Sequence, residues 1–429
     1  MQITLFGGIW IVLTILLMFS KYKYMLALML FSCIFQASAV ILIGDLAVSP
    51  WVFTSAFFIA KSIRSEFDHE EKTVPIKWII IFLIAYIAIT LVALIVFNGM
   101  KIPGEYRRNT NWTVVTAIQK PLQLTVRHIT DFIIYLLFTL DFICMARVKE
   151  RIEIEYIMKI INLIFVFVLI MGAIQYVITS LGLSSDIIEK LIYSDISNNA
   201  IAIRREGYDT KIFSTFTEPS YCGAFIASMM WLSLVLNKGK IRFIHCIAFL
   251  FIVLSGSSTA YGTFAVGAII YLLVMRDIKK LIQLSIAAVL AYIILEHFGI
   301  MDRILDAVRN KGDSISGLER GKWNEEAIKI FIKSYGWGVG MSSVRASSLA
   351  IGLLAQIGVI GTLLFVMAMG SLIIKGLYKK ASVYEKAGCV GLLCVLAAQV
   401  IACPDLTFTV LWFMIFLVCL LNRYQNNIK

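Results

Sequence analysis

Charged residues are scarce in this sequence. Asp, Glu, Lys and Arg make up 15% of its 429 residues, against about a quarter in an average soluble domain. Hydrophobic residues fill the difference, at 60% of the chain with a mean hydropathy of +0.86. A soluble protein of this composition would need helices that are apolar on every side over most of its length, so we exclude a soluble globular fold.

Common catalytic and metal-binding motifs are also missing. The four His residues are scattered, and the eight Cys residues form no Cys-x-x-Cys pair and lie mostly in or beside apolar runs, as small packing residues do. No P-loop, HExxH or GxSxG motif stands out. We therefore expect no metal site and no cofactor.

The pattern of a cleavable signal peptide is absent as well. The first apolar run, Ile3–Ser20, has no basic residue before it and is followed by Lys21 and Lys23. A signal peptide has the opposite polarity, with its positive charge in front of the apolar run. The run is therefore expected to remain as a membrane helix with an outward N-terminus.

Long apolar runs are what the sequence has in abundance. Runs of about 20 apolar residues are typical of membrane-spanning helices. We predict an all-α polytopic membrane protein, a single integral membrane domain over residues 1–429 with about thirteen transmembrane helices. The expected spans are Ile3–Ser20, Met25–Ile43, Leu46–Ala60, Lys77–Phe97, Val126–Ala146, Ile157–Leu181, Ser220–Leu236, Phe243–Leu254, Thr259–Met275, Leu281–Phe298, Ala346–Ile374, Ala387–Ala402 and Leu406–Leu421.

Basic residues follow the positive-inside rule. Seven short segments hold 22 of the 39 Lys and Arg residues, and with an outward N-terminus and thirteen crossings all seven fall on the cytoplasmic side. The other 17 lie in three longer loops, which translocate regardless of charge. We predict a cytoplasmic C-terminus and outward loops at about 98–128, 182–219 and 299–345, with short amphipathic helices.

The third outward loop contains a predicted amphipathic helix. Ser316 and Glu319 fit a capping box, and apolar residues at helical spacing follow from Trp323. Arg320 would lie in the first turn, where a cation is unfavourable unless an anion is nearby. Arg320 is therefore either part of an anion site or an arginine that extends to the membrane interface.

A glycine-rich segment, GWGVG at 336–340, comes next. Alternate glycines allow tight turns and a close approach of the backbone to a ligand, so Gly338 and Gly340 are candidate ligand contacts, with simple turn chemistry as the alternative. Ser342 and Ser343 are expected to cap the following helix, with Arg345 at its entry. A helix N-terminus with an arginine is suited to bind an anion.

The second outward loop leads from Arg204 and Arg205 to a helix start. Thr217 is expected to cap this helix, with Pro219 in its first turn. Glu218 then lies at the boundary between lipid and water. It is either an acid favoured by the helix dipole or a carboxylate placed as a general base or a ligand of a sugar hydroxyl group.

Three other features were weighed. Asp131, Asp141 and Glu296 lie near span ends, where intramembrane acids are functional candidates but solvation is an equal explanation. The small-residue segment SGSSTA at 255–260 predicts a tight turn or close helix packing. The loop at 98–128 has Glu105 as its only acid, so it offers no acidic pair for a metal-bound nucleotide sugar.

Several of these segments resemble one family when they are taken together. FSTFTEPSYCG at 213–223 resembles the F-x-E-P-S element of bacterial O-antigen polymerases (the Wzy-type family). SGSSTA at 255–260, ERGKWNEEAI at 319–328, GWGVGMSSVRASSL at 336–349 and AQIGVIG at 355–361 resemble its small-residue segment, large outer loop and exit helix. The resemblance covers roughly Arg204 to Gly361.

The resemblance implies a glycosyltransferase of the bacterial inner membrane. Such enzymes join undecaprenyl-pyrophosphate-linked oligosaccharide repeats at the periplasmic face, by an inverting-type, metal-independent transfer in which the lipid pyrophosphate leaves. Donor and acceptor are both such lipids, membrane lipids surround the protein, a chain-length regulator protein is a candidate partner, and no nucleic acid is expected.

The resemblance also gives roles to residues. Arg320 and Arg345 would hold the donor pyrophosphate, and Arg204 or Arg205 would assist. Glu218 would orient or deprotonate the acceptor hydroxyl group. Tyr221, which follows the F-x-E-P-S element, and Gly338, Gly340 and Ser342 would contact the substrate.

Two departures from the family pattern limit the comparison. Ligases of the same superfamily carry a His after the glycines, and Val344–Ser348 contains none, which favours a polymerase. The paired Arg-x10-Gly spacing of some polymerases is not found cleanly at the four arginines. The alternatives are an O-antigen ligase and, from a different class, a lipid-linked oligosaccharide flippase or other transporter. A flippase or transporter would predict charges deep in the spans and short loops on both faces.

Overall fold

The computed structural model describes residues 1–44, 46–65, 76–108, 115–148, 152–183, 186–194, 211–276 and 315–424, with isolated positions between 277 and 314. Among these residues, seven helices are long and apolar enough to cross a membrane, namely α4 (Lys77–Val96), α5 (Val126–Arg147), α6 (Ile154–Ser180), α8 (Pro219–Leu236), α10 (Ser258–Met275), α14 (Leu349–Leu377) and α15 (Val383–Ile401). The other described helices, which are shorter or more polar, are α1 (Leu5–Met18), α2 (Tyr22–Ser32), α3 (Pro50–Ile63), α7 (Asp186–Leu191), α9 (Phe243–Leu254), α13 (Ile315–Lys333) and α16 (Thr409–Tyr424).

The chain is therefore a helical membrane protein, as predicted. The number of thirteen crossings and the outward N-terminus stay predictions, and most of the expected span Leu281–Phe298 falls outside the described residues. The sequence analysis did not predict the two small antiparallel sheets that accompany the helices.

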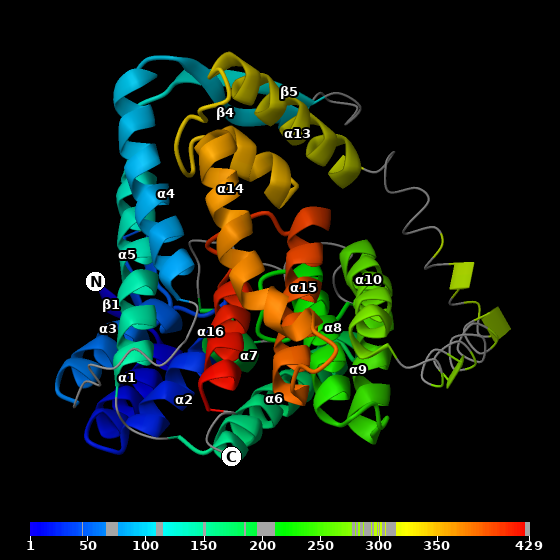
Figure 1. The fold of residues 1–429 in the computed structure, drawn as a ribbon. Helices are drawn as coiled ribbons and strands as arrows, with labels where there is room; N and C mark the ends of the chain where they lie inside the picture. The colour runs from blue at the N-terminus through cyan, green and yellow to red at the C-terminus, as the bar shows by residue number, and fades with distance from the viewer. Residues whose placement is uncertain are drawn as a thin grey trace.

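Helix α8 lies at the centre of the bundle and is buried along nearly its whole length against α10 and α15 (Figure 1). Small residues allow this close packing: a Cβ atom on Gly223 would lie 2.3 Å from the Cβ of Ala260. Residues 255–257 form the short turn between α9 and α10, where Gly256 has a φ of +57°, and residues 258–260 begin α10. The predicted turn and the predicted close packing are thus both present.

The expected spans Met25–Ile43 and Leu46–Ala60 are wrong as continuous helices. Helix α2 ends at Ser32, and the chain continues into β2 (Ile41–Ile43) and β3 (Leu46–Val48), which form an antiparallel sheet with β1 (Gln2–Ile3) before α3 begins. The buried backbone between helix and sheet is hydrogen-bonded to other loops, since Ala37 N donates to Thr215 O (3.2 Å). Irregular backbone at membrane depth is tolerated where protein satisfies it in this way.

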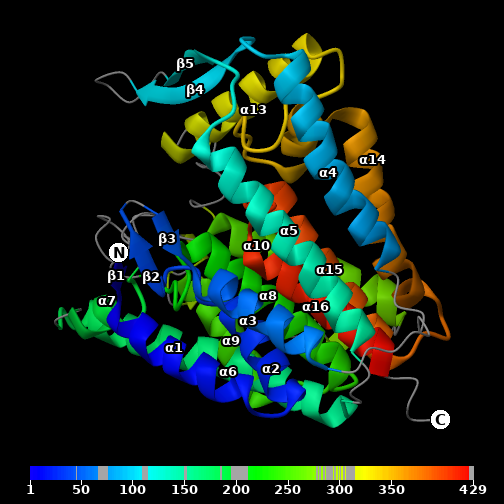
Figure 2. The same ribbon diagram turned by 90° about the vertical axis from the view of Figure 1, so that its left-hand side faces the viewer.

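A β-hairpin and an amphipathic helix cover one end of the bundle. Strands β4 (Lys101–Arg108) and β5 (Val115–Pro121) pair antiparallel, from Lys101 opposite Pro121 to Arg108 opposite Val115. Helix α13 packs beneath them over the ends of α4 and α14 (Figures 1 and 2). We call this end of the molecule, with β4, β5 and α13, the hairpin end.

Helix α13 confirms the predicted amphipathic helix but not its predicted cap. Ala327 and Ile330 are buried against residues of the hairpin and of α14, while the opposite side of the helix is exposed. Ser316 lies inside the helix, which includes Ile315, so it is not the capping residue.

Candidate functional site

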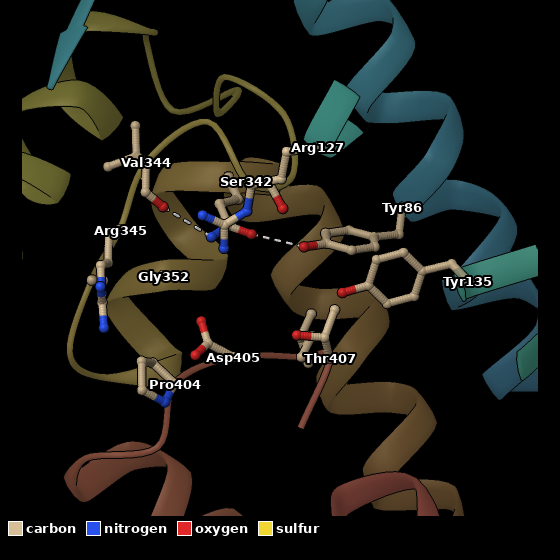
Figure 3. A pocket seen from close by; sticks show the side chains of 13 residues that line it. Tyr86, Arg127, Tyr135, Ser342, Val344, Arg345, Gly352, Pro404, Asp405 and Thr407 are labelled. Carbon is tan, nitrogen blue, oxygen red and sulfur yellow. Dashed lines mark hydrogen bonds between the residues drawn. The ribbon is translucent and has the colours of Figure 1, made fainter. Parts of the chain in front are cut away.

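A pocket of about 50 Å³ opens at the hairpin end, beside the first turns of α5 and α14 and the turn between α15 and α16 (Figure 3). A buried water needs about 10–15 Å³ by a comparable measure, so the pocket has room for a few water molecules. The lining residues come from segments far apart in the sequence: Tyr86, Arg127, Tyr135, Ser342, Val344, Arg345, Ala346, Gly352, Gln356, Pro404, Asp405, Leu406 and Thr407.

An interruption of α14 shapes one wall of the pocket. Gly358 has φ +64° and ψ −166°, values that no helix contains. The N–H of Val359 donates to Gly336 O (3.0 Å) instead of to Ala355 O, and Ala355 O accepts from Val339 N (3.0 Å). The glycine-rich segment therefore runs beside the broken helix and satisfies its backbone.

The glycines of this segment are explained by that pairing. A Cβ on Gly338 would lie 2.6 Å from the backbone carbonyl atoms of Gln356, and Gly338 has a φ of +80°. The N–H of Gly338 donates to Ser334 Oγ (3.1 Å), and that of Gly340 donates to Gln356 O (2.8 Å). The close approach predicted for a ligand is thus made by α14 itself, and these two amides are engaged within the protein.

The side chain of Gln356 connects three of the lining segments. Tyr86 Oη donates to Gln356 Oε1 at 2.7 Å, and Gln356 Nε2 donates to Val344 O at 3.0 Å (Figure 3). The rings of Tyr86 and Tyr135 meet edge to face, with centroids 4.8 Å apart. The sequence analysis missed these residues because each lies in or beside an apolar run, where polar side chains of this kind usually only pack.

Two arginines line the pocket. The guanidinium carbon of Arg345 lies 4.0 Å from the centroid of the Trp323 ring, so a cation–π contact positions this charge. Arg127 is the second residue of α5 and lies at the same pocket. Arg127 was not among the predicted site residues. Like Arg345, it is a cation beside the start of a helix that is expected to face outward, so the same sequence pattern identifies it.

Arg345 is also linked to the β-hairpin through Trp323. The rings of Tyr106, on β4, and Trp323 lie 6.0 Å apart between centroids. Burial raises the pKa of Tyr106 to about 12, Glu326 raises it too, and the nearby Arg345 guanidinium lowers it. Hairpin, α13 and Arg345 therefore form one connected cluster beside the pocket.

Glu218 and Arg320 both lie close enough to Cys403, in the turn that carries Asp405, to influence its thiol. Burial raises the pKa of the Cys403 thiol, the Glu218 carboxylate raises it further, and the Arg320 guanidinium lowers it. Both charged groups thus act on the residue just before Pro404. Two residues that the sequence placed in separate loops thus both lie near Cys403, although neither lines the pocket itself.

The start of α8 differs by one residue from the prediction. Glu218, not Thr217, is the N-cap residue, because Pro219 occupies the first helical position, as prolines often do. Glu218 Oε2 accepts a hydrogen bond from Ser220 Oγ at 3.2 Å.

Ser342 and Ser343 do not cap α14. The N-cap residue of α14 is Ser348, because the chain first runs past α4 and α5 before the helix begins. Ser342 Oγ instead donates to Asp131 Oδ2, and Ser343 Oγ lies 3.1 Å from His128 Nε2. Asp131 is therefore engaged by Ser342 at the edge of the pocket.

Asp405 is the pocket carboxylate that the sequence analysis passed over as part of a short outward turn. Its Oδ2 accepts a long hydrogen bond, 3.5 Å, from the hydroxyl group of Tyr221, a residue predicted to contact substrate. Figure 3 shows the carboxylate pointing into the pocket, with Arg345 on one side and Thr407 on the other.

The remaining predicted residues lie elsewhere. Arg204 and Arg205 fall outside the described residues. Asp141 is buried on α5, where its Oδ2 accepts from Ser55 Oγ at 2.7 Å, and it does not line the pocket. Within the described part of the chain, no three His, Cys, Asp or Glu side chains gather as metal ligands would.

The arrangement is suited to an anion and a hydroxyl group at the same time. Two guanidinium groups can hold phosphate oxygens with strong, charge-assisted hydrogen bonds. A carboxylate in the same pocket can accept the proton of a bound hydroxyl group. No protein-family model matches this chain, and no curated protein sequence matches it either.

Proposed function

We propose that this protein is an O-antigen polymerase, which joins undecaprenyl-pyrophosphate-linked oligosaccharide repeats at the periplasmic face of the inner membrane. The observation that carries the proposal is the pocket at the hairpin end, where Arg127, Arg345 and Asp405 line one cavity of a helical membrane protein. The resemblance of residues 204–361 to the Wzy-type family supports it from the sequence.

The arginines have the role of holding the leaving group. In the transfer, the bond between the donor sugar and its pyrophosphate breaks, and negative charge grows on the phosphate oxygens. Arg345 and Arg127 both line the pocket, where their positive charges would stabilise that negative charge once the bound donor displaces water. Arg320 adds positive charge beside the pocket, and Arg204 or Arg205 assists from the second loop.

Glu218 and Tyr221 have the role of orienting the acceptor. Tyr221 reaches the pocket carboxylate through its hydroxyl group, and Glu218 begins the same helix. Ser342 lines the opposite wall. Gly338 and Gly340 contribute by holding the broken helix α14 in place, not by direct contact with substrate.

Purified protein in detergent tests the proposal directly. With an undecaprenyl-pyrophosphate repeat unit from the host strain as the only substrate, wild-type protein is expected to produce a ladder of polymers on a gel. The ladder is expected to be unchanged in EDTA, because the proposed transfer uses arginines for the leaving group. Transfer that occurs only when a lipid A core acceptor is added would identify a ligase instead, and no transfer by folded protein would reject both.

The contact between Trp323 and Arg345 gives a second prediction. Trp323→Leu is expected to lower the polymerisation rate about two- to fivefold, because a cation–π contact is worth about 0.5–1 kcal/mol at an exposed site. Trp323→Phe keeps an aromatic face and is expected to lose less. Initial rates of the two variants decide the matter, since equal losses would show that the ring serves only as packing.

A further inference from the structure

Asp405 differs from the other acids near the pocket in the position and the hydrogen bonding of its carboxylate. Asp131 accepts a hydrogen bond from the hydroxyl group of Ser342, and Glu218 accepts one from Ser220 outside the pocket lining. Among the described residues that line the cavity, Asp405 is the one with a carboxylate. The hydrogen bond that the described residues make to this carboxylate is the long one from the hydroxyl group of Tyr221.

The backbone of Asp405 is held firmly. Its carbonyl oxygen accepts from Gln399 Nε2 (3.1 Å) and from Phe408 N (3.0 Å). The next carbonyl oxygen, that of Leu406, accepts from Trp412 Nε1 at 2.5 Å. Gln399 and Trp412 are fully buried, so the turn is anchored to the inside of the bundle. A carboxylate on such a turn has a fixed origin and few competing partners, as a group that binds substrate requires.

The same pocket places a positive charge within reach of that carboxylate. Arg345 and Arg127 line the cavity together with Asp405. In the described part of the chain, neither Arg345 nor Arg127 forms an ion pair with the Asp405 carboxylate, for which nitrogen and oxygen would lie within 4 Å. The carboxylate and the two guanidinium groups therefore line one space without pairing with one another, so the pocket offers a proton acceptor to a hydroxyl group and positive charge to an anion.

We propose that Asp405 is the catalytic base that removes the proton from the acceptor hydroxyl group. This inference rests on the proposed polymerase function and replaces Glu218 in that step. The acceptor O–H proton moves to the Asp405 carboxylate as the acceptor oxygen forms a bond to the anomeric carbon of the donor. The bond from that carbon to the pyrophosphate oxygen breaks, and its electron pair leaves with undecaprenyl pyrophosphate, whose charge the arginines offset. The proton on Asp405 then passes to solvent.

Two substitutions at Asp405 test the proposal in the full-length protein with the undecaprenyl-pyrophosphate repeat unit as the probe. Asp405→Asn keeps the size of the side chain and is expected to lower the turnover rate at least about a hundredfold, in the range of general base catalysis. Asp405→Gly leaves a space for a small carboxylate. Sodium formate is expected to restore its activity at least about tenfold, and sodium chloride of equal ionic strength is expected to restore none.

The controls separate this inference from the proposed function. Glu325→Gln makes the same carboxylate-to-amide change on the exposed side of α13, where ion pairs to Lys322 and Lys329 contribute little, and is expected to keep the wild-type rate. If wild type and Glu325→Gln make a ladder and Asp405→Asn keeps more than about a hundredth of that rate, or formate restores Asp405→Gly less than about tenfold, the base is another group. No ladder from folded wild-type protein would remove the proposed function and this inference with it.

Discussion

Arg345→Ala is expected to reduce the rate of polymer formation about ten- to a hundredfold. A hydrogen bond to a charged group contributes about 1.5–3 kcal/mol, and about 1.4 kcal/mol corresponds to a factor of ten in rate. Arg345 lines the pocket and is positioned by the Trp323 ring, so its guanidinium group is already placed when substrate arrives. The effect is expected in the turnover rate more than in the KM for the lipid-linked repeat, because charge grows on the leaving group only during the reaction.

Two further variants show whether the position of the charge matters. Arg345→Lys keeps the charge but loses the planar fork and its stacking on Trp323, and an intermediate rate is expected. Lys329→Ala removes a positive charge from an exposed site on α13 at the same end of the molecule and is expected to have little effect. Equal losses in Arg345→Ala and Lys329→Ala would mean that the hairpin end acts only through its net charge.

Gly358→Ala is expected to be the most destabilising single substitution near the site. A methyl group there would lie 2.2 Å from Gly336 O, and a φ of +64° is unfavourable for alanine. Strain of about 1–2 kcal/mol from the backbone adds to about 1–3 kcal/mol from overpacking. Gly336 O accepts a hydrogen bond from Val359 N across the break, so it cannot move away without losing that bond.

The matched control lies on the same helix. Gly370 has a helical backbone, is exposed, and has open space where a Cβ would go, so Gly370→Ala is expected to leave stability unchanged or slightly higher. The difference in stability is measured by heating both variants in detergent and determining the fraction of protein that stays monodisperse. A wild-type melting temperature for Gly358→Ala would show that the interruption of α14 is not needed for the fold.

The sequence predicted the helices better than it predicted where they stop. Apolar runs located α4, α5, α8, α10 and α15 to within a few residues, because burial in lipid requires the same length of apolar sequence wherever it occurs. It failed between Ser32 and Pro50, where the chain is equally apolar but its backbone bonds to distant loops. Hydropathy measures how apolar a segment is, and it contains no information about hydrogen bonds between its backbone and distant loops.

The residues at the pocket divide in the same way, into those that a local sequence pattern marks and those that only the fold brings together. Arg345 and Ser342 were found because local patterns, glycines and a helix start, marked their segment, and the structure places both at the pocket. Asp405 and Arg127 lie in or beside short segments with no distinguishing pattern, and only the fold brings them to the same cavity. The capping prediction at Thr217 was wrong by one residue because Pro219 occupies the first helical position and makes Glu218 the N-cap. The prediction at Ser342 was wrong because tertiary contacts engage Ser342 and Ser343, and α14 begins after Ser348.

The order in which the ribosome makes these segments has a consequence for when activity appears. The walls of the pocket are contributed by α4, α5, the segment before α14 and the turn at Asp405, and that turn is anchored by Trp412 on α16. A nascent chain that has inserted every helix up to α15 still lacks both the carboxylate and its anchor. In the proposed polymerase, the reactive centre would therefore be complete only when the last described helix has been added, and partly made chains would not consume the proposed lipid-linked substrate.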